Sequence, residues 1–516
     1  MIPFDASGDF HPVAEASELR RLAVRGAAAT VSAQWLGLVL QIVGTVLLAR
    51  LLTPADFGVV AMVTTFSMLL MSFGSNGFHE VVIQRDGISR FQASNLFWIT
   101  SAAGLVLTIG FAAAASLLAR FFRNPLVTPV AMTMAVAIFI TAISEIHIAL
   151  LKRSMRFSAV SANAVVARAV YTVVAIALAQ IGWGYWALVI GIIGYALSVT
   201  VGAWWLCRWI PSMPRRGVGT RAMIAFAANV YGRFTANYFS RNFDTLLIGW
   251  QFNAAALGLY KRAYDLFALW ESQLTSPLHN VALAALSRMN EDAARFRRCL
   301  ANSLGIVAFI GMAVGVDLTL VGQDVVRLAF GPKWSESGRI FALFGPGIGV
   351  MLLYSIVGWI HLSIGNPGRW LRWTLVESAV TILLFVVALP LGPAGLAAAW
   401  SASFWILPIP AFWYAGRPVE FGVSSFINAV WRYTVASILA GLLTVAVIRG
   451  TLLWGPPPDV KVALAATVII SALFGSLYLG AVTLLHWGCA PLRQLATLLR
   501  ELAPAGRPKR TAAESV

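Results

Sequence analysis

The sequence predicts an all-α polytopic membrane protein with about fourteen transmembrane helices. Hydrophobic residues make up 59% of its 516 residues and charged residues only 11%, a balance that a water-soluble chain of this length could not bury around a core. Apolar runs of about 20 residues, the length that crosses a bilayer, recur along the chain. Lysine and arginine also divide unevenly between alternate connections, as membrane topology requires.

Charge clusters, Gly/Pro turns and aromatic edges separate the apolar runs into helices. Six lie near 26–50, 57–77, 93–118, 126–150, 159–180 and 184–207. Six more lie near 222–249, 257–286, 299–322, 338–362, 371–389 and 394–415, and two follow near 428–448 and 462–487. The longest polar connections, near 78–92, 208–221, 287–298 and 323–337, are too short for an extracellular catalytic domain.

This order predicts two pseudo-symmetric six-helix halves around a central cavity, with two additional C-terminal helices. The expected segments are a cytoplasmic N-terminal segment (1–25), an N-terminal lobe (26–208), a cytoplasmic linker (209–221), a C-terminal lobe (222–416), two further transmembrane helices (417–490) and a basic cytoplasmic tail (491–516).

Loop charges predict the orientation of the chain. With this helix count, 25 lysines and arginines fall on the side of the N-terminus and eight on the other. Positive charges near helix ends are retained in the cytoplasm, so both termini are expected there. The net charge of +17 is then mainly a topology signal, and we expect no nucleic-acid partner. The N-terminal 25 residues hold four acids and no apolar run, unlike a cleavable signal peptide.

Motifs of common enzymes and metal sites do not occur in the sequence. It has no Walker A motif, no H-E-x-x-H, no G-x-S-x-G and no spaced Cys/His cluster. The scattered histidines, among them His147, His279, His361 and His486, are interpreted as packing or interfacial residues. The three cysteines form no paired motif and fit a reducing compartment. We therefore expect no enzyme, no catalytic residue, no metal and no cofactor.

One short segment recurs about 200 residues later. Residues 47–59 read LLARLLTPADFGV and residues 246–260 read LLIGWQFNAAALGLY. With one inserted residue, both give a helix end, a turn and a helix start that contains glycine, Gly58 or Gly258. Because each copy opens a six-helix set, the two sets are expected to be parallel repeats about an axis normal to the membrane. Transporters with such repeats hold substrate between the halves and alternate access by rocking them.

Polar residues interrupt the seventh and eighth helices. Charge inside a membrane helix costs at least about 2.5–3.5 kcal/mol per residue, so it usually faces a polar cavity or a partner. In the seventh helix the polar positions recur every three or four residues and occupy an arc of about 120°. They are Asn229, Arg233, Asn237, Arg241 and Asp244.

The eighth helix has a narrower polar stripe that includes Lys261 and Asp265, with Arg262 and Glu271 beside it. A milder stripe in the first helix includes Gln34 and Gln41, and Arg168 lies inside the fifth helix. We expect these groups to line one water-filled cavity. An alternative is that Arg241 pairs with Asp244, and Lys261 with Asp265, to neutralise each other locally. The seventh and eighth helices hold four cations against three acids, so local pairing leaves a positive cavity that suits an anionic cargo.

Three short segments resemble a known family. Residues 48–58, together with 244–249 and 257–264, look like the polysaccharide transporter family of Wzx-type lipid-linked oligosaccharide flippases. That family belongs to the multidrug/oligosaccharidyl-lipid/polysaccharide exporter superfamily, and the resemblance covers nearly the whole chain in helix count, two-half layout and short loops. It implies a bacterial inner-membrane protein that moves undecaprenyl-diphosphate-linked repeat units to the periplasmic leaflet by alternating access. These units feed exopolysaccharide, capsule or O-antigen (lipopolysaccharide) synthesis, so a polysaccharide polymerase and export machinery are expected partners beside the lipid.

Substrate contacts are expected at the cationic and amide side chains of the polar stripes, because guanidinium donates two hydrogen bonds to phosphate. These residues are Arg233, Arg241, Lys261, Arg262, Asn229, Asn237, Gln34, Gln41 and Arg168. The resemblance also implies coupling to an H⁺ or Na⁺ gradient, for which the available acids are Asp244, Asp265 and Glu271.

Three other functions remain as alternatives. An ion-coupled multidrug antiporter of the same superfamily would share the architecture, but cationic drugs favour an acidic cavity. A peptidoglycan-precursor flippase also handles a lipid diphosphate. A membrane polysaccharide polymerase, ligase or glycosyltransferase would normally have an extended outer loop with catalytic residues. Fold alone does not separate them.

Overall fold

The computed structural model describes residues 3–5, 8, 10, 16–85, 87–216, 220–269, 292–364, 367–449, 460–489 and 493. Nearly all of these residues are helical, and within this part of the chain the only β-type pairing is an isolated bridge between Phe4 and Phe10. The predicted all-α class is confirmed. The described part forms two compact units: Met1–Arg262 with Ala329–Trp334 and Leu389–Pro393, and the remaining residues from Ala263 onward.

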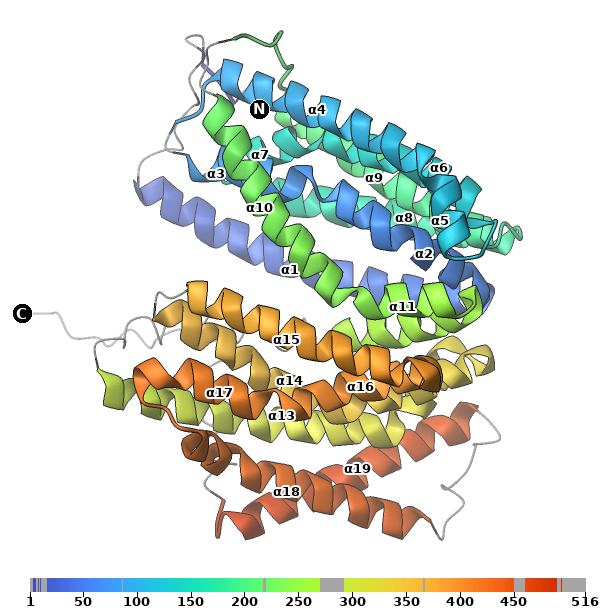
Figure 1. Cartoon of the computed structure of the whole chain (residues 1–516), viewed down its shortest axis with the longest axis vertical. Helices are drawn as coiled ribbons and strands as arrows, with labels where there is room; N and C mark the ends of the chain where they lie inside the picture. Colours follow the sequence, from blue (N-terminus) through green and yellow to red (C-terminus); the bar gives the residue numbers. More distant parts are fainter. Residues whose placement is uncertain are drawn as a thin grey trace, which may run out of the picture. The chain divides into compact units, whose positions relative to one another are not determined.

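The first unit contains the helices drawn in blue to green in Figure 1. They are α1 (Ala16–Leu51), α2 (Pro54–Met71), a π-helical turn η1 (Gly74–Phe78), α3 (His79–Gln84), α4 (Arg90–Ala113), α5 (Ala115–Phe121), α6 (Val127–Ala142), α7 (Glu145–Arg153), α8 (Phe157–Gln180), α9 (Tyr185–Cys207), α10 (Thr220–Arg241) and α11 (Phe243–Gln251). A further helix covers 254–269, and the boundary between the two units falls within it.

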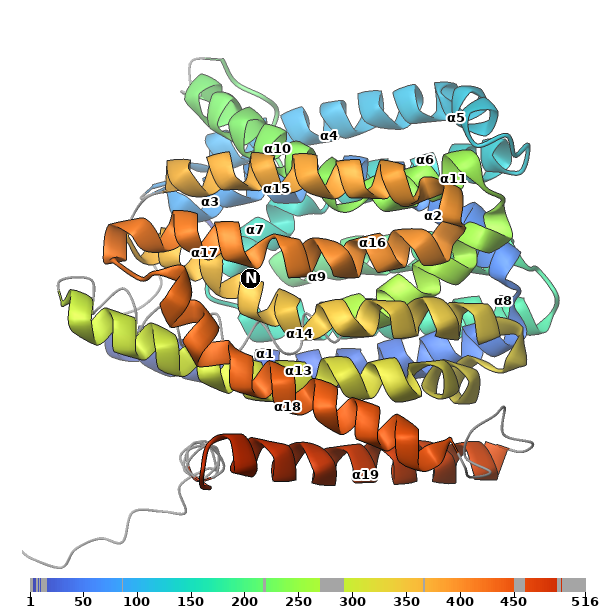
Figure 2. The ribbon, with the colours of Figure 1, turned by 60° about the horizontal axis from the view of Figure 1, so that its bottom comes forward.

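The second unit contains the remaining long helices. They are α13 (Ala293–Phe330), α14 (Ser335–Ser363), α15 (Pro367–Ala388), α16 (Gly392–Ile406), α17 (Pro408–Gly416), α18 (Val423–Ile448) and α19 (Val460–Leu485). Short 3₁₀ turns follow α13, α15 and α17 at Pro332–Trp334, Leu389–Leu391 and Arg417–Val419. The last two helices, α18 and α19, lie side by side, as Figure 2 shows.

Within the described residues, eleven stretches are long and apolar enough to cross a membrane. One of them, Gly368–Val419, includes α15, α16 and α17 and so spans two of the expected helices. The expected span 222–249 is not among them, and much of the expected span 257–286 lies outside the described residues. The membrane-protein class is therefore confirmed, whereas the count of fourteen stays a prediction.

Several predicted helix bounds were wrong. The expected second helix ended at residue 77, but the chain continues through the π-helical turn into α3, so part of the predicted connection 78–92 is helical. The expected fourth helix is two helices, α6 and α7. The connections predicted near 287–298 and 323–337 are also largely helical where described, because α13 extends over 38 residues.

The repeated segments contact each other backbone to backbone. A Cβ added to Gly58 would overlap the carbonyl oxygen of Ala254, and a Cβ added to Gly258 would overlap that of Pro54. The two helix starts are also capped alike, since Thr53 accepts from the backbone N–H of Asp56 and Asn253 from that of Ala256. Each copy of the repeat therefore packs against the other in a reciprocal arrangement that only a small residue permits.

Replacing Gly258 with alanine should test this contact. We expect Gly258→Ala to lower the free energy of unfolding by about 1–3 kcal/mol, because the new methyl group meets a main-chain carbonyl that has no rotamer to change. The measurement is the thermal melting midpoint of the purified protein. Gly475→Ala, in α19, is the matched control because nothing lies within 4 Å of the added Cβ. Equal melting midpoints for the two variants would contradict the contact.

Candidate functional site

The predicted polar face of the seventh helix is present on α10. Its four members Asn229, Arg233, Asn237 and Arg241 are all exposed. The opposite face of α10 is fixed to α2, because the hydroxyl of Tyr231 donates to the carbonyl of Leu69 and that of Tyr238 to the carbonyl of Thr65, each at 2.9 Å. These two bonds determine which way α10 is rotated and so leave its amide and guanidinium groups on the free side.

Asp244 does not share this face. The helix is interrupted after Arg241, and Asp244 lies in the first turn of α11 with only 1% of its surface exposed. Its carboxylate accepts from the Tyr260 hydroxyl at 2.6 Å and from the backbone N–H of Thr245 at 2.7 Å. The predicted arc from residue 229 to residue 244 is therefore broken. Within the described residues Asp244 forms no ion pair with Arg241, so the local-pairing alternative is wrong for these two residues.

The eighth helix is described as far as residue 269, so Glu271 lies outside the described residues. Lys261, Arg262 and Asp265 are all half-buried. The guanidinium of Arg262 lies 4.0 Å from the centre of the Phe57 ring, a cation–π contact within the first unit. Asp265 belongs to the second unit.

The structure brings together two of the predicted polar residues from different helices. Arg168 in α8 donates a hydrogen bond to the side-chain oxygen of Gln41 in α1. Gln41 is exposed and Arg168 is half-buried, so the pair forms one polar position on the α1–α8 surface. Gln34 is exposed two turns earlier on α1.

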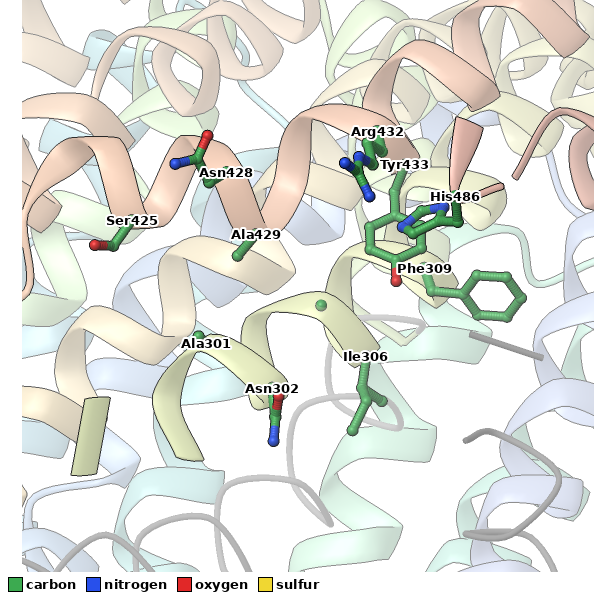
Figure 3. Close-up of a pocket in the computed structure, with 11 residues that line it drawn as sticks. Ala301, Asn302, Ile306, Phe309, Ser425, Asn428, Ala429, Arg432, Tyr433 and His486 are labelled. Atoms are coloured by element: carbon green, nitrogen blue, oxygen red, sulfur yellow. The ribbon is translucent and has the colours of Figure 1, made fainter. Parts of the chain in front are cut away.

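The second unit contains a polar pocket that the sequence did not predict. It has a volume of about 480 Å³ and lies between α13 and α18, near the end of α19. Figure 3 shows Arg432, Tyr433 and His486 gathered at one end of it. The sequence predicted no site at Arg432, and His486 was interpreted as a packing or interfacial residue. Their shared pocket depends on contacts between distant helices, although Asn302, Asn428 and Arg432 are polar residues near the ends of apolar runs, a signal that the sequence did contain.

A second, apolar groove of about 400 Å³ lies farther along α13 and α18. It includes Met312, Val316, Pro346, Trp405 and Leu442. The polar pocket offers a cation and amides, and the groove offers apolar side chains. An amphipathic molecule could contact both kinds of surface.

Removing the Tyr260 hydroxyl tests how much its hydrogen bond to the buried Asp244 stabilises the fold. We expect Tyr260→Phe to lower the free energy of unfolding by about 1–3 kcal/mol, because a buried carboxylate loses its shortest hydrogen bond. The thermal melting midpoint is again the measurement, with Tyr185→Phe as a control at a half-buried tyrosine. Equal melting midpoints for Tyr260→Phe and Tyr185→Phe would show that the bond contributes nothing to stability.

Comparisons with known proteins agree with this architecture. Residues 47–339 match the family described as polysaccharide biosynthesis protein. The chain is 23% identical to the lipopolysaccharide biosynthesis protein WzxC of Escherichia coli (strain K12) over 68% of this chain and 69% of that protein. It is 22% identical to the succinoglycan biosynthesis transport protein ExoT of Rhizobium meliloti (strain 1021), over 66% of this chain and 69% of that one. It is 21% identical to the teichuronic acid biosynthesis protein TuaB of Bacillus subtilis (strain 168), over 83% of this chain and 89% of that protein.

Two solved structures share the fold. The lipid II flippase MurJ in an inward closed conformation has a TM-score of 0.67 at 16% identity, covering 88% of this chain and 98% of that one. An inward-facing multidrug resistance MATE family transporter of the MOP superfamily has a TM-score of 0.54 at 13% identity, covering 76% and 98%. Because the family match spans more than half of the chain and includes both copies of the repeat, this multi-pass membrane protein belongs to the polysaccharide biosynthesis protein family.

Proposed function

We propose that this protein is a flippase that moves undecaprenyl-diphosphate-linked oligosaccharide repeat units across the bacterial inner membrane by alternating access. The observation that supports this most directly is the exposed face of α10, where Arg233 and Arg241 alternate with Asn229 and Asn237. Arginine pairs with phosphate oxygens through two parallel hydrogen bonds, and amides suit sugar hydroxyls. A prenyl tail needs no polar site, because it can remain in lipid.

The burial of Asp244 supports an anionic cargo. Tyr260 and Thr245 satisfy this acid away from the α10 face, so it does not neutralise the two arginines. A cationic drug would meet repulsion at such a surface. Family membership and the relatives WzxC, ExoT and TuaB, all named for biosynthesis of a cell-surface polymer or for its transport, support the same cargo class.

The remaining assignments belong to this proposal. Lys261, Arg262, Gln34, Gln41 and Arg168 are further head-group contacts. Coupling to an H⁺ or Na⁺ gradient involves an intramembrane acid, and the polymer is completed by a polymerase and export machinery. Both termini lie in the cytoplasm.

Gene deletion and complementation test the flippase and its arginines together. We expect deletion to abolish surface polymer and to leave lipid-linked repeat units on the cytoplasmic face. The double variant Arg233→Ala/Arg241→Ala should restore polymer at least about tenfold less well than wild type, because each lost charge-assisted hydrogen bond is worth about 1.5–3 kcal/mol. The measurements are polymer yield and analysis of lipid-linked intermediates at matched expression.

Arg295→Ala/Arg298→Ala provides the matched control, since it also removes two exposed arginines from a single helix, α13. It should complement fully. Unchanged polymer in the deletion strain, together with increased sensitivity to cationic drugs, would overturn the flippase in favour of the antiporter.

Thiol labelling tests the orientation. Cys489 is exposed and follows the last helix, so it should be on the cytoplasmic side. In a Cys207→Ser/Cys299→Ser background, a membrane-impermeant maleimide should label Cys489 only after cells are permeabilised. Pro125→Cys, in the exposed turn before α6, should react in intact cells once Cys489 is also replaced by serine. Labelling of Cys489 in intact cells would reverse the topology.

A further inference from the structure

Two membrane spans of the first unit are interrupted at the same place. After α2 ends at Met71, the π-helical turn η1 leads into α3, which begins at His79. After α6 ends at Ala142, a short break precedes α7, which begins at Glu145. The turn η1 contacts α7, and a Cβ on Gly74 would lie 2.5 Å from the Cγ atom of Glu145. Interrupted spans and π-helical turns are often found at functional sites in membrane proteins.

A titratable pair lies where the two breaks meet. The Nδ1 atom of His79 is 3.6 Å from the Oε2 atom of Glu145. His79 is 7% exposed and Glu145 6% exposed, and their chain neighbours Phe78 and Ile146 belong to a buried apolar cluster. Among the described residues neither ring nitrogen of His79 has a hydrogen-bond partner.

Burying such a pair is energetically unfavourable, so its presence points to a function. An isolated charge in an apolar interior is strongly disfavoured, and removing either partner leaves the other uncompensated. An intramembrane ionisable group is therefore a candidate functional site by default. His147, two residues after Glu145, has a different environment. Its ring stacks on that of Trp204 with the ring centres 4.3 Å apart, and its Nε2 atom lies 3.2 Å from the Trp209 carbonyl oxygen. It is therefore a packing residue, as the sequence predicted.

Other charged groups near the pair have different positions. Arg153 donates to the carbonyls of Val82 and Arg85 near the end of α3. Glu80 is half-buried, and its Oε2 atom has no hydrogen-bond partner among the described residues. The charged and titratable side chains on α3, α7 and the elements packed against them are Glu80, Arg90, His147, Lys152, Arg153, Arg168, Tyr171, Tyr185, Tyr195, Cys207, Arg221, Tyr231, Arg233, Tyr238 and Arg241.

We propose that His79 and Glu145 form a proton-binding site that couples proton uptake to movement at the breaks between α2 and α3 and between α6 and α7. One proton from water converts neutral histidine and carboxylate into an imidazolium–carboxylate pair without net charge. This loaded pair is compatible with burial. Loss of the proton leaves a bare buried carboxylate, which favours opening of the breaks so that water can reach it.

The backbone at the break between α2 and α3 is irregular. Gly77 has a φ of +146°, a conformation that a side chain disfavours, and Asn76 before it is also non-helical. A Cβ on Gly77 would lie 2.7 Å from the carbonyl oxygen of Ala227 in α10, the helix that also holds Arg233 and Arg241. Figure 1 shows α10 lying across this part of the first unit. A change at the η1 turn would therefore reach the proposed cargo face through one backbone contact.

A proton suits the pair better than a metal ion. Two side chains offer too few ligands for Na⁺ or a divalent cation, and the described residues contain no cluster of three or more His, Cys, Asp or Glu side chains that could hold a metal. This proton assignment rests on the proposed transport function for its purpose, but it can be tested without transport.

The test is hydrogen–deuterium exchange of the full chain in lipid nanodiscs. Peptides covering 72–84 and 143–150 are followed between about pH 5.5 and about pH 8, after correction for intrinsic amide exchange. We expect wild type to exchange about tenfold faster at the upper pH, because release of the bound proton favours opening of the breaks. Glu145→Gln should remove this pH dependence, and Glu145→Asp should restore it. Glu420→Gln, at an exposed ion pair with Arg297, should behave as wild type.

Several outcomes would overturn the site. The first is exchange in wild type that does not depend on pH. The second is a Glu145→Gln variant that keeps the pH dependence of wild type. The third is loss of the pH dependence in Glu80→Gln but not in Glu145→Gln. Exchange that responds to added Na⁺ at constant pH would replace the proton with a metal ion. If Glu145→Gln does not fold, as judged by size-exclusion chromatography, His79→Gln is measured instead and should shift the profile.

Complementation separates this site from the flippase proposal. At matched expression, Glu145→Gln should restore polymer at least about tenfold less well than Glu145→Asp if the proton drives transport. Normal polymer from Glu145→Gln with an altered exchange profile would disprove the coupling while leaving the flippase intact. Normal polymer in the deletion strain would disprove the flippase, and the exchange result would still decide the proton site.

Discussion

The contact between the two copies of the repeat determines much of the first unit. Gly58 meets the carbonyl of Ala254 and Gly258 meets the carbonyl of Pro54, so the helices approach as closely as their backbones allow. Hydrophobic burial gives helices little reason to associate in lipid, where close packing of small residues matters more. The same corner holds the 3₁₀ turn before α14, because the indole nitrogen of Trp334 donates to the Ala49 carbonyl at 2.8 Å and its ring packs edge-on against Phe57. Segments hundreds of residues apart are thereby held in one unit.

Much of this organisation was predictable because it depends on local patterns. Membrane spans follow from apolar length, the α10 face from periodicity, and the repeat from two short strings with glycine at the same position. The breaks in the second and fourth spans were not predictable in this way. Ser144 occurs in a stretch where apolar residues dominate, and the polar run Gly74–Gly77 reads as the end of a span, because hydropathy does not distinguish a π-helical turn from a helix end.

The candidate site shows the same limit. Periodicity placed Asp244 beside Arg241, but the helix is interrupted between them, and the partner that holds the acid, Tyr260, lies sixteen residues further along. His79 was assigned to a connection, and Glu145 was treated as part of an apolar run. Their pairing depends on two separate interruptions that coincide in space, so no single window of sequence contains it. The separation of the buried Asp244 from the α10 arginines is thus a product of tertiary structure.

The reciprocal glycine contact also restricts how such a chain can evolve. When a side chain fills a gap left by a glycine, a later change in that side chain can compensate for a new methyl group. Here each glycine faces a main-chain carbonyl of the other copy, and no substitution changes the size of a carbonyl group. Neither glycine can therefore be replaced by a larger residue unless the two helix starts move apart. Charge and loop sequence can therefore differ between the two copies while the two glycines must stay small.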